Sequence, residues 1–514
     1  MIMSLISKVK VKLFLFLGLV SLSALILISC SGGGDDVPAS KQGTEKNPYT
    51  INWYTVAIGQ QRDMPMVLKK ANEYLRKKIG VELDITVINF ANYNQKMGVN
   101  MISGGDMDLV FTCAWANNYL TNVSIGTLHP MNELLEKYGQ GIKKALSPAF
   151  LEGPKVDGEL YAIACNKEVA QQSAYRFNAK FLKELGFKIS DFKPNAGLES
   201  LRSIIPYFKV AKEKLGPKGI TTYAYWGNQV YVLQDQNYLQ QDISIPGAVK
   251  MEEGNFKVFN QYESKEVMDY FELYHELFNK GYIPGSAATV KNNMSLVLAE
   301  KIAVDNQQYQ PCADVVWSET NGYPMVSFPG ITPITTNQSV MGAMVGIVKT
   351  SKRPDLCMKF LNLLNTDVYL RNLLNYGIEG VHYKKTAPNR IKYLPAHSNY
   401  IMPDYTLGNE FITYLLPKDP ETKWEQFKAW NASAKESQIL GFHPNLTPVQ
   451  TEFAAILNVV HQYKADLFTG AVDPKVYVPK LLKALDNAGV KKYLAEMQKQ
   501  LNEWVKNVKD KEKK

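Results

Sequence analysis

The sequence contains none of the common signatures of serine hydrolases, zinc proteases or nucleotide-binding proteins. Neither GxSxG, HExxH nor the phosphate-binding loop GxxxxGK[ST] occurs in its 514 residues. The five cysteines form no CxxC pair and the six histidines are scattered, so the spacing shows no metal or redox motif. We therefore expect no catalytic residue, no metal and no cofactor.

The composition excludes two broad classes of protein. With 46% hydrophobic and 21% charged residues, the chain is neither disordered nor a polytopic membrane protein. The net charge of +9 comes from dispersed basic residues, and no nucleic-acid-binding signature accompanies it. Because single hydrophobic cores stop growing near ~250–300 residues, the length indicates two or more domains.

The amino terminus has the pattern of a secretory signal. Three lysines precede an apolar run, Leu13–Ile28, that is short for a membrane span. The sequence LISC, which ends at Cys30, resembles a bacterial lipobox and implies lipid on Cys30 after cleavage of residues 1–29. Several acyl chains would give durable membrane attachment. A plain signal anchor with an incidental cysteine is the alternative interpretation.

A polar stretch follows the signal. Residues 30–47 show no hydrophobic pattern, so we expect a flexible tether between the membrane and the folded part. Four further cysteines lie far apart in the folded part, and buried free thiols are their simplest interpretation. One or two disulfides are the alternative outside the cytoplasm, and the sequence cannot pair them. The four are Cys113, Cys165, Cys312 and Cys357.

The first folded segment alternates strands and helices. We expect strands at Tyr49–Ala57, Val81–Ile88 and Asp108–Thr112, with one helix capped at Asp63 and ended by Gly80 and another across Tyr93–Ile102. This spacing is typical of a parallel sheet with right-handed crossovers. Such a sheet binds ligands beyond the carboxyl ends of its strands.

The later part of the chain is predicted more coarsely. It shows short strands, single amphipathic helices and, over its last seventy residues, three helices with core-facing stripes. The expected strands are Leu160–Ala164, Thr221–Trp226, Ile302–Val304 and Val340–Val348, and the expected single helices are Tyr262–Asn279 and one that begins at Pro354.

Several motifs in this order resemble the family 1 extracellular solute-binding proteins, which include maltodextrin binders. SGGDMDLV at Ser103–Val110 resembles the family's approach to its third strand, and DGELYAI at Asp157–Ile163 resembles its crossing between lobes. Ala164 stands where that crossing pattern has proline. RPDLCMKFL at Arg353–Leu361 resembles a later helix of the family.

A narrower resemblance lies in the second half. NYGIEGVHY at Asn375–Tyr383 is similar to a segment of the LipO/YtcQ-like lipoproteins. Gly441–Pro448 and the region up to Trp504 resemble the DUF3502 domain that ends that subgroup. The resemblance covers nearly the whole chain from Tyr49, and its specificity comes from the order of motifs that are individually weak.

The resemblance implies an α/β, type II periplasmic-binding-protein fold with two lobes. Each lobe is expected to hold a mainly parallel sheet flanked by helices. Residues 48–162 and about 340–400 would form the N-terminal lobe, and residues 163–339 and about 401–514 the C-terminal lobe with the DUF3502-like helices. We expect the hinge near Ile163–Cys165, Val304–Asn306 and Val348–Lys349.

The implied function is capture of a carbohydrate, most simply an oligosaccharide, for the permease of an ABC transporter. The protein would act outside the cytoplasm as a lipid-anchored monomer, on the periplasmic or cell-surface face, and without turnover. ATP would be hydrolysed by another subunit, because this chain has no phosphate-binding loop. A binder of peptides or polyamines, a secreted glycan-active enzyme and a surface adhesin are the alternatives.

A sugar presents hydroxyl groups on its rim and C–H patches on its faces, so its binder needs aromatic platforms and polar side chains. We look for these at strand ends and in the subgroup motif. Two of these predictions have an alternative. Trp53 could lie in the core instead of the binding site, and Glu379 and His382 could form a buried hydrogen-bonded pair instead of contacting the ligand. The predicted ligand-binding residues are Trp53, Tyr54, Gln60, Asp63, Trp115, Trp226, Asn306, Gln307, Tyr309, Glu379 and His382.

Overall fold

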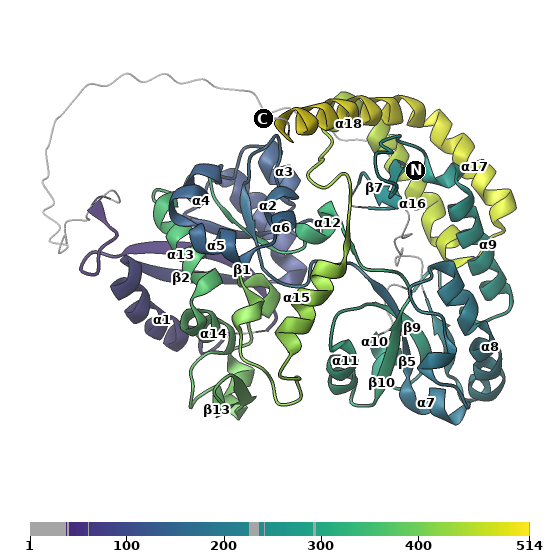
Figure 1. The fold of residues 1–514 in the computed structure, drawn as a ribbon, viewed down its shortest axis with the longest axis horizontal. Coiled ribbons are helices and arrows are strands. Elements are labelled where there is room, and N and C mark those ends of the chain that lie inside the picture. The colour runs from purple at the N-terminus through teal and green to yellow at the C-terminus, as the bar shows by residue number, and fades with distance from the viewer. Residues whose placement is uncertain are drawn as a thin grey trace, which may run out of the picture. The chain divides into compact units, whose positions relative to one another are not determined.

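The structure is a computed structural model that describes residues 38, 41–59, 61–225, 236–240, 242–290 and 294–512, with side chains up to residue 507 (Figure 1). The chain divides into two units, Met1–Pro38 and Ala39–Lys514. The elements below belong to the second unit. The predicted signal peptide, Cys30, Gln60 and Trp226 lie outside the described residues.

The first lobe is built around a five-stranded sheet in the order β2-β1-β3-β12-β4. Its strands are β1 Tyr49–Ala57, β2 Val81–Asn89, β3 Leu109–Thr112, β4 Ala162–Ala164 and β12 Met344–Ile347. β1 pairs in parallel with β2 and β3, whereas β12 is antiparallel to both β3 and β4. The mainly parallel sheet predicted for this lobe is confirmed, with β12 as its one reversed strand.

The helices that connect the first three strands begin and end at residues that favour helix termini. α1, Met64–Ile79, follows Asp63 and has proline in its first turn, and α2 is Phe90–Ser103. α1 ends at Gly80, whose φ of 68° favours glycine. A Cβ at Gly80 would also lie 2.3 Å from the backbone oxygen of Gly43, so this helix end tolerates no side chain.

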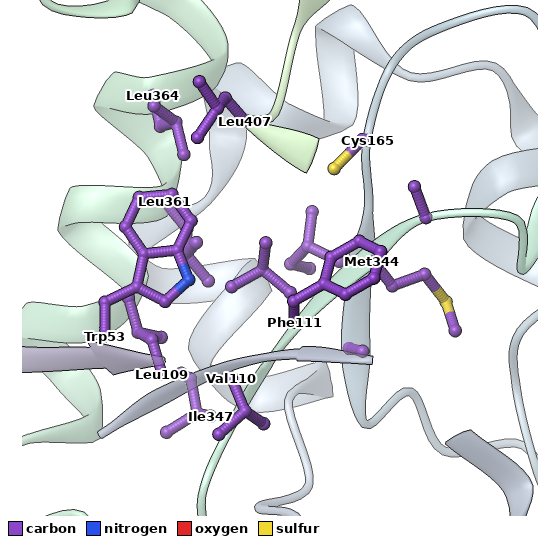
Figure 2. Packing of buried hydrophobic residues seen from close by; sticks show 14 of the residues in the cluster. Trp53, Leu109, Val110, Phe111, Cys165, Met344, Ile347, Leu361, Leu364 and Leu407 are labelled. Carbon is purple, nitrogen blue, oxygen red and sulfur yellow. The ribbon is translucent and has the colours of Figure 1, made fainter. Parts of the chain in front are cut away.

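The core of the first lobe packs against this sheet (Figure 2). Its buried side chains come from residues 49–169 and 340–407. Trp53 lies at its centre, with its ring centroid 5.8 Å from that of Phe360 on α13, Pro354–Thr366. The chain therefore leaves this core after β4 and returns to it before β12.

The second lobe is built around a four-stranded sheet in the order β10-β5-β9-β6. Its strands are β5 Ser173–Asn178, β6 Thr221–Ala224, β9 Ile302–Gln308 and β10 Met325–Pro329. Only β6 and β9 pair in parallel; β5 is antiparallel to both β9 and β10. The prediction of a mainly parallel sheet is wrong for this lobe, because β5 enters from the first lobe and β10 follows a short helix that reverses the chain.

The second core draws on residues 175–328 and 439–501. Its long helices are α8 Leu198–Leu215, α9 Lys265–Asn279, α16 Gln450–Thr469, α17 Pro474–Asn487 and α18 Val490–Glu512. α16 and α17 contact each other and α9 (Figure 1). The three predicted C-terminal helices are thus present and pack on the second lobe.

Shorter elements complete the described chain. The remaining helices are α3 Tyr119–Ser124, α4 Asn132–Tyr138, α5 Gln140–Ala145, α6 Pro148–Glu152, α7 Ala179–Glu184, α10 Met294–Leu298, α11 Ala313–Asn321, α12 Asn337–Val340, α14 Val368–Tyr376 and α15 Lys423–Ser433. The remaining strands are β7 Gln236–Tyr238, β8 Ala248–Lys250, β11 Ile334–Thr335, β13 Tyr383–Ala387, β14 Arg390–Tyr393 and β15 Lys435–Glu436. None of the helices in the described ranges is apolar over a length that could span a bilayer.

Candidate functional site

Three segments cross between the lobes, and hydrogen bonds join them side by side. We call them the crossing segments: residues 165–172, 330–343 and 434–440. Gln171 exchanges two backbone hydrogen bonds with Ile334, at 2.7 and 2.9 Å. β11 in the second segment pairs in parallel with β15 in the third. Any relative movement of the lobes must therefore bend three connected strands together.

This arrangement corrects the predicted hinge. Val304–Asn306 lies inside β9, and β9 is followed by α11 and β10 of the same lobe. Val348–Lys349 follows β12 and leads to α13 in the first lobe. Only the predicted site near Ile163–Cys165 borders a crossing segment, because the chain leaves the first sheet there.

Helix α15 is fastened to the first crossing segment by one side chain. The Asn431 Oδ1 atom accepts hydrogen bonds from the backbone N–H groups of Val169 and Ala170, at 3.0 and 3.4 Å. Its Nδ2 atom donates to the Lys167 carbonyl oxygen at 2.9 Å. Trp430 adds a bond from its Nε1 to Gln172 Oε1 at 2.7 Å. α15 thus fixes the backbone of this crossing segment over residues 167–172.

A cavity of about 600 Å³ lies where the lobes and all three crossing segments meet. We call it the junction cavity. Its walls come from α3 of the first lobe, from residues 237–240 and 242–245 of the second lobe and from residues 442–453. Its floor includes Gln171, Thr336 and Ser437, one from each crossing segment. The volume lies within the ~300–1,000 Å³ typical of small-molecule sites.

The lining of the junction cavity is almost free of charge. Asp242 is the only carboxylate among the described residues of the lining, and it is already engaged by Lys464 at 3.0 Å and by the Ser244 hydroxyl. The other polar groups of the described lining are neutral amides and hydroxyls and the imidazole of His443, whose pKa burial lowers to about 4, and three further aromatic rings accompany them. This chemistry suits a neutral, polyhydroxylated guest. The amides, hydroxyls and rings are those of Asn118, Thr121, Ser124, Gln171, Asn237, Tyr238, Gln240, Thr336, Asn337, Gln338, Ser437, Phe442, Asn445, Thr447, Gln450 and Phe453.

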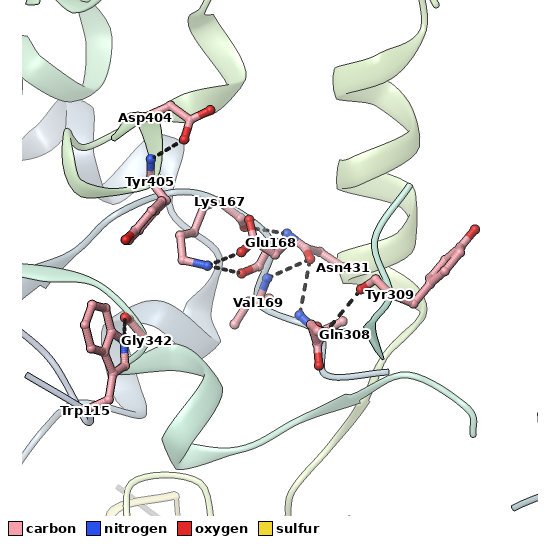
Figure 3. Close-up of polar contacts among 11 residues, drawn as sticks. Trp115, Lys167, Glu168, Val169, Gln308, Tyr309, Gly342, Asp404, Tyr405 and Asn431 are labelled. Atoms are coloured by element: carbon pink, nitrogen blue, oxygen red, sulfur yellow. Dashed lines mark hydrogen bonds and ion pairs between the residues drawn. The ribbon is translucent and has the colours of Figure 1, made fainter. Parts of the chain in front are cut away.

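Trp115 presents an indole beside the crossing segments (Figure 3). It follows β3 and is 50% exposed. Its Nε1 donates to the Gly342 carbonyl oxygen in the second crossing segment at 2.8 Å, and its ring stacks on Phe90 with a centroid distance of 6.0 Å. These contacts fix the ring while half of its surface stays open, as an aromatic platform for a sugar requires.

A charged cluster lies in the first crossing segment near Trp115 (Figure 3). Lys167 forms a close ion pair with Glu168. Burial opposes the charge of Lys167, but Glu168 outweighs it and raises the pKa of this lysine. Glu410 is buried nearby and its Oε2 has no hydrogen-bond partner among the described residues. Burial, with repulsion from Asp404 and Glu168, raises the Glu410 pKa well above its ordinary range.

Two predicted ligand-binding residues lie inside the cores. Trp53 is 0% exposed and packs on Phe360, so the core alternative is the right one. Asn306 is 2% exposed and accepts a close hydrogen bond from the Tyr223 hydroxyl. The prediction is wrong for both residues. For Asn306 the reason is that β9 extends to Gln308, which places Asn306 within the strand rather than after it.

Asp63 and His382 are brought together, but as a structural tie. The Asp63 Oδ2 atom lies 3.1 Å from His382 Nε2 and also accepts from Asn399 Nδ2 at 3.3 Å. His382 is fully buried and its Nδ1 accepts from the backbone N–H of Ile378 at 2.9 Å, so Nε2 carries the proton toward Asp63. Glu379 is exposed and lies 3.7 Å from Lys385. The alternative of a buried pair between Glu379 and His382 is therefore wrong, and burial of His382 contradicts its predicted ligand role.

Of the other predicted residues, Tyr309 bonds to the first crossing segment, whereas Gln307 and Tyr54 contact residues of their own lobes. Tyr309 is half-buried; its backbone N–H donates to the Gln172 carbonyl oxygen at 2.7 Å, and its ring meets Trp430 edge-on at 6.1 Å. Gln307 donates to Asp305 Oδ2 at 2.9 Å, and Tyr54 is partly buried against the first core. None of the predicted ligand residues that the structure describes lines the junction cavity.

The four cysteines of the folded part are free thiols. Cys113, Cys165 and Cys357 are buried, and Cys312 is partly exposed. Burial raises the pKa of Cys113 to about 12 and that of Cys165 to about 11, which keeps both protonated and unreactive. Within the described ranges no three His, Cys, Asp or Glu side chains are grouped as metal ligands would be.

Sequence reasoning missed most of the residues at the junction. Short runs of neutral amides mark several of them: Gln171-Gln172 in the first crossing segment, Asn337-Gln338 in the second, and Asn117-Asn118 after β3. Pairs of amide residues at the predicted lobe crossings could therefore have predicted part of the cavity lining. Phe442 and Gln450 stand outside any run of amides, and Phe453 carried no signal because the stripe of the α16 helix predicts only core packing for its apolar residues.

Comparison with known proteins establishes the family. A "Carbohydrate ABC transporter substrate-binding protein" of Streptococcus pneumoniae serotype 4 (strain ATCC BAA-334 / TIGR4) is 31% identical over 463 residues, which cover 88% of this chain and 90% of the relative. The chain belongs to the carbohydrate ABC transporter substrate-binding proteins.

Solved structures agree with this family and with the two-lobed fold. The N-glycan transport solute binding protein NgtS of Streptococcus pneumoniae is 29% identical, with a TM-score of 0.81 over 89% of this chain and 99% of that one. NgtS in complex with Man5GlcNAc gives a TM-score of 0.70 at the same identity and coverage. The two lobes, predicted from the sequence, are confirmed.

The carboxyl end of this substrate-binding protein matches a second family. Residues 438–506 match the family described as "Domain of unknown function (DUF3502)", which confirms the predicted C-terminal segment. The match begins within the third crossing segment and includes α16, α17 and most of α18. In this substrate-binding protein the DUF3502 segment therefore belongs to the second core and also supplies a wall of the junction cavity.

Proposed function

We propose that this protein captures a neutral oligosaccharide in the junction cavity and delivers it to the permease of an ABC transporter. The observation that carries this proposal is the chemistry of the cavity: amides and hydroxyls from both lobes and aromatic rings from the second surround it, and the one carboxylate of its described lining is already paired. The NgtS structure with Man5GlcNAc supports a glycan as the guest. Trp115, Tyr309, Gln307 and Tyr54 are proposed to contact further parts of the same ligand.

The site discriminates against the alternative ligands by its charge. A peptide would bring charged termini and a polyamine several positive charges, and neither would find an unpaired countercharge in the described lining. A sugar hydroxyl instead pairs with the neutral amides, and each buried polar group left without a partner costs about 1–3 kcal/mol. The proposed specificity is thus for uncharged, hydroxyl-rich molecules.

A melting screen tests this proposal. The full chain is heated with Man5GlcNAc, maltohexaose, a tetrapeptide or spermidine, and a binding oligosaccharide should stabilise it by about 2.7 kcal/mol at a hundredfold excess over Kd. Recovery of the unaltered oligosaccharide after incubation separates a binder from a glycan-active enzyme. A shift with the tetrapeptide or spermidine and with neither oligosaccharide would overturn the proposal.

We also propose how the molecule is organised and placed. Residues 1–29 act as a signal peptide, Cys30 carries lipid, and residues 30–47 tether a monomer outside the cytoplasm, as in the LipO/YtcQ-like lipoproteins. Residues 48–162 with about 340–433 form one domain, since residues 401–433 bond to the first lobe before the third crossing segment begins, and residues 163–339 with about 434–514 form the other. Lipid on an amino-terminal Cys30, sought by mass spectrometry of the membrane-bound protein, supports the anchor, and an unprocessed amino terminus contradicts it.

A further inference from the structure

The wall that the DUF3502 segment gives to the junction cavity consists of one loop and the start of one helix. Asn445 lies in the loop, Thr447 begins the 3₁₀ turn Thr447–Val449 that ends it, and Gln450 and Phe453 lie in the first turn of α16. Phe442 completes the wall from the turn before the loop. The wall thus combines two amides, a hydroxyl and two rings on one side of the cavity.

We infer that this wall recognises one pyranose unit of the bound oligosaccharide, and that the DUF3502 segment is thereby a specificity determinant of the protein. The inference rests on the proposed function and extends it to a segment with no assigned role. A ring such as Phe453 offers a flat apolar surface for the C–H face of a sugar, while amides at Asn445 and Gln450 can bond its hydroxyls. Neither side chain is buried; the Asn445 Oδ1 accepts from the Thr447 N–H at 2.9 Å, so Asn445 would donate to a ligand from its Nδ2.

The loop is held in place from behind, by the last helix of the chain. Gln500 on α18 accepts a hydrogen bond from the Asn445 N–H at 2.7 Å and donates one to the Asn445 carbonyl oxygen at 2.9 Å. Trp504 on the same helix packs its ring against Phe442 at 5.8 Å. Such support reduces the conformational entropy that the loop would lose when it binds a ligand.

The same wall is locked to the crossing segments. Asn337 donates from its Nδ2 to the carbonyl oxygens of Ile439 and Phe442, at 3.0 and 2.9 Å, and its Oδ1 accepts from the Gly441 N–H at 2.7 Å. The opposite side of the cavity carries Asn118 and Thr121 of the first lobe. A sugar unit against this wall would therefore contact the DUF3502 segment and reach toward the first lobe across the crossing segments.

Calorimetric titration of the full chain with Man5GlcNAc and with maltohexaose tests this inference. Phe453→Ala and Gln450→Ala remove groups of the wall, and each should weaken binding about fivefold to twentyfold, since one lost stacking or hydrogen-bonding contact changes Kd by about that factor. Gln500→Ala leaves every lining side chain in place but frees the loop, and should weaken binding by a smaller factor at an unchanged stoichiometry.

Matched controls lie on the same helix. Leu457→Ala removes a partly buried apolar side chain of α16, and Asn458→Ala an exposed amide; neither residue lines the cavity, so both should bind within about twofold of the unaltered chain. If the unaltered chain binds an oligosaccharide and the wall variants bind as the controls do, this inference alone is overturned. If the unaltered chain binds neither oligosaccharide, the proposed function is overturned with it.

Discussion

At the scale of single residues, Gly377 explains why the NYGIEGVHY segment folds as it does. Its φ of 80° and ψ of −145° form a combination that glycine almost alone adopts. A Cβ there would lie 2.4 Å from His382 Nδ1, the atom that accepts the Ile378 N–H. The NYGIEGVHY motif is therefore a folding device that holds His382 against Asp63.

Gly377→Ala should lower the free energy of unfolding by more than about 3 kcal/mol, because it adds a steric clash to backbone strain. Gly380→Ala is the matched control: its φ is 83°, but a Cβ there meets nothing within 4 Å. The control should lose only about 1–2 kcal/mol. Urea unfolding of both variants measures the difference, and equal losses would contradict this role of His382.

His443 predicts a pH dependence of stability. Its Nε2 donates to the Gly153 carbonyl oxygen of the first lobe at 2.7 Å, and burial lowers its pKa from 6.5 to about 4. Between these two values the unfolded chain binds the proton and the folded chain does not, so the stability present above pH 6.5 is lost as the pH falls toward 4. This one group contributes at most about 3 kcal/mol to that loss.

His443→Gln isolates this contribution, because glutamine can donate the same hydrogen bond but does not titrate. Urea unfolding at pH 7.0 and pH 4.5 should show a smaller drop in stability for the variant than for the unaltered chain. Buried and paired carboxylates titrate in both proteins and cancel in the comparison. The same drop in both proteins would show that the proton on His443 has no influence on folding.

The residue scale also shows why the ligand contacts were predicted poorly. The sequence predicts sugar contacts for Trp53, Trp115 and Asn306, yet the structure buries the first and the third. Side chains alternate across a strand, and a sequence does not show how far the strand extends. Asn306 was predicted beyond a strand that in fact continues to Gln308.

At the scale of elements, helix α15 is the feature that sequence patterns did not reveal. Only Trp424 and Phe427 of its eleven residues are buried, too few to form an apolar stripe. Its role depends instead on Asn431, whose three backbone contacts lie more than 260 residues away in the chain. No local pattern encodes such a long-range contact.

Asn431→Ala should destabilise the first crossing segment by about 1–3 kcal/mol, since it leaves two N–H groups and one carbonyl of that segment without their partner. Asn431→Asp keeps the acceptor for Val169 and Ala170 but faces the Lys167 carbonyl with a second oxygen, so it should restore only part of the loss. Hydrogen exchange at Val169 and Ala170 reports the change directly. Lys428→Ala on the exposed side of α15 is the control, and exchange as fast in the control as in Asn431→Ala would refute the role of the amide.

The sheets show a second limit of prediction at this scale. The parallel β1–β2–β3 unit followed from strand and helix spacing, because consecutive parallel strands need a helical crossover. The second sheet did not, since β5 and β9 pair across more than a hundred residues. The spacing of strands and helices along the sequence does not predict an antiparallel pair whose strands are so far apart in the chain.

At the scale of the whole molecule, the lobes depend on each other through three joined segments and one cavity. The junction cavity takes residues from both lobes, so a guest that fits it gains contacts only where the lobes meet. A ligand shifts a conformational equilibrium only by its difference in affinity for the two states. We therefore expect an oligosaccharide to favour whichever arrangement of the lobes encloses it most completely.

The location of the sugar tests the central claim most directly. A crystal structure of the full chain with Man5GlcNAc should show sugar rings between Asn118 of the first lobe and Phe453 of the DUF3502 segment, with hydrogen bonds to the neutral amides of the lining. Sugar bound only on an outer face of either lobe, with the junction cavity holding solvent at a saturating ligand concentration, would contradict it.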